Sequence, residues 1–134
     1  MKSNHKKKKS LEKLKILIVE DESIVARDIQ NMLERLGSGP SFIALSGGDA
    51  LKKAKTHKPD LVLMDIKLHE DMDGIECARR IQSLQPTPVV YFSALSDEST
   101  MKRARATQPF FFIPKPIVES ELKKTILEVI AQPG

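Results

Sequence analysis

The sequence has 134 residues, of which 40% are hydrophobic and 30% are charged. This length suits one domain with a hydrophobic core, and no apolar run approaches the roughly 18 residues that span a membrane. The N-terminal lysines are not followed by the apolar segment of a secretory signal. Cys77 is the single cysteine, which excludes an internal disulfide and fits a reducing compartment. We therefore expect a cytoplasmic globular domain.

The net charge of +4 is concentrated at the N-terminus. Five lysines precede Ser10, so residues 1–13 are expected to be a basic, disordered tail. Residues 14–131 are expected to form the folded domain, and 132–134 its C-terminal end. No aromatic residue lies among these lysines, so the pattern only weakly indicates a nucleic-acid site. We expect the domain to bind neither nucleic acid nor membrane.

The first half of the chain alternates between strand and helix patterns. Residues 15–19, which are apolar from Ile16 onward, predict a buried strand, and a helix pattern begins at Ile24. Residues 42–45 predict a short second strand, and the polar turn at 46–49 starts a second helix. Residues 60–65 predict a third strand, buried on both faces and ending in an aspartate.

The second half continues the alternation. The remaining elements, in chain order, are a helix over 75–84, a strand over 88–92, a less hydrophobic helix over about 97–106, a strand over 110–113 and a helix from Glu119. Leu84 is predicted on the buried face of the first of these helices. Five strand-helix units with short connections indicate the α/β class. The predicted architecture is a doubly wound, five-stranded parallel sheet in the flavodoxin-like order 2-1-3-4-5, with helices on both faces.

Polar side chains follow four of the predicted strands. They are Glu20 and Asp21 after the first strand, Asp65 at the third, Ser93 at the fourth and Lys115 at the fifth. The carboxyl ends of parallel strands share one edge of a sheet, where ligands bind. Three carboxylates repel one another unless a cation lies among them, and Mg²⁺ prefers oxygen ligands. A carboxylate can also attack a phosphoryl group whose charge a lysine offsets. The edge therefore favours phosphoryl transfer to a carboxylate.

These motifs together resemble the receiver domain of two-component response regulators. The matching segments are Ile-Leu-Ile-Val-Glu-Asp-Glu at 16–22, Asp-Leu-Val-Leu-Met-Asp at 60–65, Asp-Gly at 73–74, Ser-Ala at 93–94 and Lys-Pro at 115–116. The resemblance covers about residues 14–131. It implies a phosphorelay role in which Asp65 accepts a phosphoryl group from a histidine kinase or phosphotransfer protein. No turnover of a separate substrate is expected.

The resemblance also implies a role for each neighbouring residue. Mg²⁺ would be bound by Asp21, by Asp65, by the backbone carbonyl of Lys67 and, through water, by Glu20. The phosphoryl oxygens would be held by Ser93 and Lys115, and the Lys115–Pro116 peptide would be cis. Ser93 and Phe112 would form a switch acting on the helix near Asp97, the fifth strand and the last helix. That face could pair with a second receiver.

The loop from Ile66 to Asp73 departs from the family's common form. It lacks proline and is one residue longer than usual.

A haloacid dehalogenase-like phosphatase would need a second aspartate where Lys67 stands. A flavin-binding flavodoxin is disfavoured because the acidic residues after the first strand would repel the flavin phosphate. A calcium-binding loop is disfavoured because His69 would occupy the first ligand position. A phosphorylation-independent scaffold remains the alternative. The histidines are expected at the surface, without a role.

Overall fold

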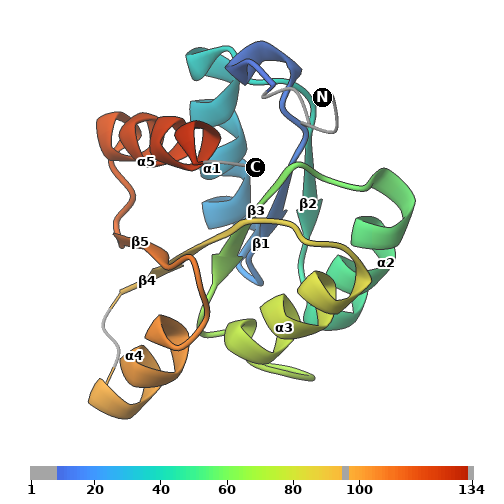
Figure 1. The fold of residues 1–134 in the computed structure, drawn as a ribbon, viewed down its shortest axis with the longest axis vertical. Helices are drawn as coiled ribbons and strands as arrows, with labels where there is room; N and C mark the ends of the chain where they lie inside the picture. The colour runs from blue at the N-terminus through green and yellow to red at the C-terminus, as the bar shows by residue number, and fades with distance from the viewer. Residues whose placement is uncertain (1–8, 95–96, 133–134) are drawn as a thin grey trace, which may run out of the picture.

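The computed structural model describes residues 9–94 and 97–132 (Figure 1). Five parallel strands form one sheet in the order β2-β1-β3-β4-β5, which confirms the predicted order. The central strand β3 has neighbours on both sides, consistent with the continuous apolar run that precedes Asp65. The strands are β1 (Ile16–Val19), β2 (Ser41–Ala44), β3 (Leu61–Asp65), β4 (Val89–Ser93) and β5 (Phe111–Pro114).

Helices cover both faces of the sheet. Figure 1 shows α1 and α5 together on one side and α2, α3 and α4 on the other. Right-handed crossovers between parallel strands produce this arrangement when the chain winds out from β1 in both directions. The helices are α1 (Ser23–Leu36), α2 (Gly47–His57), α3 (Gly74–Leu84), α4 (Glu98–Arg105) and α5 (Glu119–Ala131).

The core has two layers because successive strand residues point to opposite faces of the sheet. In β1, Ile16 and Ile18 pack beneath α1 and α5, whereas Leu17 and Val19 pack against α2 and α3. Cys77 is buried in the second layer, as expected for a small hydrophobic residue. Ala104 is the one buried residue of α4, consistent with the less hydrophobic sequence of this helix.

The strand register brings the polar strand ends together. Val19 pairs with Met64, so the residues that follow β1 lie level with Asp65 at the end of β3. Asp65 pairs in turn with Phe92 in β4. The carboxyl edge of the sheet is therefore where Asp65 and its predicted partners meet, as the topology requires.

Leu84 does not lie on the buried face of α3, so that prediction was wrong. Its side chain is 46% exposed, whereas Ile75 and Ile81 are almost fully buried. Each residue turns an α-helix by about 100°, so three residues turn it by about 300°. Leu84 is three such steps after Ile75, and its side chain therefore points about 180° away from that of Ile75.

Part of the predicted N-terminal tail has regular structure. Leu11–Lys13 form a 3₁₀ helix, and Leu11 packs against the core layer beneath α1 and α5. Lys9 forms an ion pair with Asp60, with 3.1 Å between its Nζ and Asp60 Oδ1. The predictions for residues 1–8 and 133–134 lie outside the described residues. The division at residue 13 stays a prediction.

Among the described residues, two peptide bonds before proline are cis. The Lys115–Pro116 bond confirms the prediction, and the Gln108–Pro109 bond was not foreseen. Within residues 9–94 and 97–132, none of the helices combines the length and apolar character needed to cross a bilayer.

Candidate functional site

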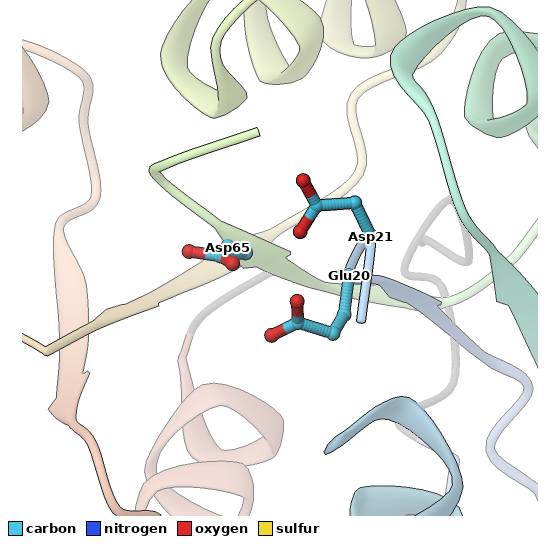
Figure 2. Close-up of side chains that lie close together, drawn as sticks. All are labelled: Glu20, Asp21 and Asp65. Atoms are coloured by element: carbon cyan, nitrogen blue, oxygen red, sulfur yellow. The ribbon is translucent and has the colours of Figure 1, made fainter. Parts of the chain in front are cut away.

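Three carboxylates gather at the carboxyl edge of the sheet. Glu20 and Asp21 directly follow β1, and Asp65 is the last residue of β3. One ligand oxygen from each lies within 4.8 Å of the others. Glu20 and Asp65 are 0% and 2% exposed, and Figure 2 shows the three groups arranged around a common space. The structure thus brings together the predicted carboxylates.

Lys115 extends into this cluster from the segment after β5. Its Nζ lies 2.9 Å from Glu20 Oε1 and 3.2 Å from Asp65 Oδ2. The same atom lies 5.5 Å from the centre of the Phe92 ring, within reach of a cation–π contact. The ammonium group therefore balances two of the three acids, as the order of the strands led us to expect.

Burial and charge shift the pKa values of this cluster. Burial raises the pKa of Glu20 to about 7, although the Glu22 N–H and Lys115 both favour its charged form. Burial lowers the pKa of Lys115, but the hydrogen bond to Glu20 and the charge of Asp65 outweigh it and raise this pKa overall. Both shifts reflect acids held in a poorly hydrated pocket around a single ammonium group.

Asp21 has a partner that the sequence did not suggest. The backbone N–H of His69 donates to Asp21 Oδ2 at 3.2 Å, and the imidazole Nδ1 lies 2.6 Å from the same oxygen. Burial would raise the pKa of Asp21, but the contacts with His69 lower it overall. His69 is exposed, as expected, yet it contacts the site; its place in the loop after Asp65 was the only signal.

The other predicted residues lie in the loop after β3 and on the neighbouring strands β4 and β5. The backbone N–H of Lys67 donates to Asp65 Oδ1 at 3.0 Å. Ser93 ends β4, is 1% exposed, and its carbonyl accepts from the Lys115 N–H at 2.8 Å. The Phe112 ring is half-buried and lies 6.3 Å from the Phe110 ring, centre to centre. The catalytic, metal-binding and switching roles of these residues stay predictions.

A small oxygen-seeking cation fits this donor set. Among the described residues, Asp21 Oδ1 is a buried oxygen without a hydrogen-bond partner. Such an atom is expensive to leave unpaired, and a cation would satisfy it. All three side chains offer oxygen rather than nitrogen or sulfur, which is the chemistry that Mg²⁺ prefers. The residues present therefore suit the metal that the resemblance implies.

Comparison with known families identifies the family to which this chain belongs. The family described as "Response regulator receiver domain" matches residues 16–127, which include all the site residues above. The chain belongs to this family. It is thus the receiver domain of a response regulator, with the flavodoxin-like fold of that family and a role in phosphorelay signalling.

Individual relatives agree with this assignment. The transcriptional regulatory protein PdtaR of Mycobacterium tuberculosis is 36% identical over 108 residues, which cover 81% of this receiver and 52% of PdtaR. The receiver therefore spans about half the length of that relative. The signal receiver domain of a modulated diguanylate cyclase from Desulfovibrio desulfuricans has a TM-score of 0.82 and 30% identity, covering 88% of this chain and 94% of its own.

A third relative was solved as a complex. The CheX-CheY-BeF3-Mg+2 complex from Borrelia burgdorferi contains a chain with a TM-score of 0.79 and 26% identity. The match covers 89% of this receiver and 90% of that chain.

Proposed function

We propose that Asp65 is the phosphoacceptor and takes its phosphoryl group from a histidine kinase or phosphotransfer protein. The observation that carries this proposal is the position of Lys115 Nζ, 3.2 Å from Asp65 Oδ2 at the end of the central strand. An ammonium group beside a buried carboxylate can offset the charge that arrives with a phosphoryl group.

The proposed transfer needs no further reactant than the phosphohistidine donor. One Asp65 oxygen bonds to phosphorus while the bond from phosphorus to the donor's imidazole nitrogen breaks. The imidazole keeps the electron pair of that bond and, because its other ring nitrogen carries a proton, leaves as neutral imidazole. Lys115 and the Ser93 hydroxyl would hold the phosphoryl oxygens, and the Lys67 N–H would keep Asp65 oriented. The domain would thereby catalyse its own phosphorylation without turning over a separate substrate.

We assign the magnesium site to Asp21, Asp65 and the backbone carbonyl of Lys67, with Glu20 acting through water. The acidic cluster and the unpaired Asp21 Oδ1 support this set. When bound, Mg²⁺ would neutralise charge on the phosphoryl oxygens. The Borrelia relative that was solved with Mg²⁺ and BeF3 supports the choice of metal. The buried Cys77 thiol suits a site of action in the cytoplasm.

Substitution of Asp65 by asparagine should abolish phosphorylation, because the amide keeps the shape and loses the nucleophilic charge. The measurement is transfer of labelled phosphate from a phosphohistidine donor, with acid- and base-labile label expected on the wild type and absent from Asp65→Asn. Asp28→Asn, which changes an exposed carboxylate on α1, should be labelled like the wild type. Label that persists in Asp65→Asn would refute the assignment, and wild-type protein without label would favour the scaffold alternative.

We further propose that phosphorylation shifts the face formed by α4, β5 and α5 toward a partner-binding state. Ser93 ends β4 beside β5, and Phe112 lies in β5. Two apolar residues, Val118 just before α5 and Leu127 within it, are 51% and 44% exposed. Phenylalanine has no hydroxyl to fix either ring position, so we expect a shallow population shift. That face would pair with a second receiver or another protein.

Backbone NMR spectra with and without beryllofluoride and Mg²⁺ test this switch. We expect shifts at the Asp65 pocket and along α4, β5 and α5, and no such shifts in Asp65→Asn. Shifts confined to the pocket would show that the site binds a phosphoryl mimic without moving the output face.

A further inference from the structure

The loop between β3 and α3 is closed at its base. The Gly74 N–H donates to the Ile66 carbonyl at 2.8 Å, so the two ends of the loop meet beside Asp65. Between them, Lys67 to Asp73 project from the edge of the sheet. Such a loop has its base fixed by the sheet, but its outer part needs contacts of its own to hold one conformation.

Asp71 supplies such a contact at the outer end. Its Oδ2 accepts from the Gly48 N–H at 2.8 Å, and its Oδ1 is 3.3 Å from the Gly47 nitrogen. These are the first two residues of α2, whose N–H groups have no partner within the helix. The hydrogen bond from Gly48 is the main cause of the lowered pKa of Asp71. An anion at this end of a helix is also favoured by the helix dipole.

The two glycines of α2 let the loop lie against the helix. A Cβ on Gly47 would be 2.6 Å from Met72 Cγ, and one on Gly48 would be 3.1 Å from Asp71 Oδ2. Met72 itself packs against the core layer beneath α2 and α3. Asp71 and Met72 therefore fasten the loop to α2 through both polar and apolar contacts.

The fastened loop carries one proposed magnesium ligand and one residue that contacts another ligand. Lys67 begins the outer part and would supply a carbonyl ligand, and His69 contacts Asp21 Oδ2 at 2.6 Å. Lys67 and His69 lie four and two residues before Asp71 in the chain. Their positions are therefore set from two sides, by the sheet at Asp65 and by α2 at Asp71.

We propose that Asp71 is a positioning residue for magnesium binding in this receiver. Its carboxylate holds the β3–α3 loop on the first turn of α2 and thereby keeps the Lys67 carbonyl and Asp21 in a geometry that accepts the ion. This inference rests on the magnesium site proposed above. Contacts behind the direct ligands commonly change metal affinity by about 10- to 100-fold.

The test is a Mg²⁺ titration of unphosphorylated protein followed by backbone NMR shifts. We expect Asp71→Ala to raise the Mg²⁺ dissociation constant about tenfold. Asp71→Asn, which keeps one acceptor oxygen, should lie between Asp71→Ala and the wild type. With a small acyl phosphate donor, Asp71→Ala should need correspondingly more Mg²⁺ for half-maximal labelling of Asp65, with a maximal rate near that of the wild type.

Two control variants separate positioning from charge and from helix stability. Glu70→Ala removes a carboxylate from an exposed position of the same loop and should leave Mg²⁺ affinity within about twofold. Ser46→Ala removes another cap of α2, since Ser46 Oγ accepts from the Asp49 N–H at 3.1 Å, without touching the loop. It should lower stability as much as Asp71→Ala but leave Mg²⁺ affinity unchanged.

Equal Mg²⁺ affinities in Asp71→Ala and Glu70→Ala would overturn the proposal, as would an equal loss in Ser46→Ala. Either result would leave the phosphoacceptor assignment intact, provided that wild-type protein is labelled on Asp65. Wild-type protein that neither binds Mg²⁺ nor takes label would instead refute the function on which the inference rests.

Discussion

Substitution of Gly74 by alanine is expected to destabilise the receiver severely and to stop phosphorylation. A Cβ at this position would lie 2.0 Å from the Asp65 carbonyl oxygen and 2.8 Å from the Ile66 Cα. Both are backbone atoms, so no side-chain rotation can relieve the overlap. Either α3 must move away from β3, or the end of β3 must shift and carry Asp65 with it.

The expected loss of stability is roughly 3 kcal/mol or more, at the upper end of the range for overpacked sites. Urea denaturation measures it, and labelling from a phosphohistidine donor measures the effect on Asp65. Gly37→Ala is the matched control, because nothing lies within 4 Å of its Cβ although its φ is +79°. The left-handed backbone alone should cost that variant about 1 kcal/mol and leave labelling unchanged. Gly74→Ala with the stability and labelling of Gly37→Ala would show that the close approach is easily relieved.

The sequence predicted the elements of the site that depend on strand ends. Glu20, Asp21, Asp65 and Lys115 each follow or end a strand whose apolar run is unambiguous. Parallel strands place such residues at one edge whatever the details of the loops. Their meeting point could therefore be predicted before any distance was known.

The contacts made by the β3–α3 loop could not be predicted in this way. His69 and Asp71 reach groups that are 48 and 23 residues away in the chain. No periodic pattern specifies a pairing between an irregular loop and a distant backbone, because the pairing depends on the path of the loop in space. The wrong prediction for Leu84 has a different cause, because residues spaced by three stay on one face of a helix for only about two turns.

Substitution of Lys115 by methionine should change phosphorylation and magnesium binding in opposite directions. Methionine keeps much of the length and apolar stem of lysine and removes the charge. Glu20 and Asp65 would then lose the ammonium group that lies 2.9 and 3.2 Å from their oxygens. With its counter-charge gone, the carboxylate cluster becomes more attractive to Mg²⁺, and we expect the Mg²⁺ dissociation constant to fall several-fold.

Phosphorylation of this variant should be slower by about 100-fold or more, the usual effect of removing one charge-stabilising group from a transition state. The incoming phosphoryl group would meet two buried acids without the cation that offsets them. Lys52→Met is the matched control, because it removes a positive charge from an exposed side chain on α2 that has no role in the site. It should alter both measurements by less than about threefold. If Lys115→Met bound Mg²⁺ more weakly, or took phosphate at the wild-type rate, Lys115 would be a structural partner of Glu20 rather than the group that receives the phosphoryl charge.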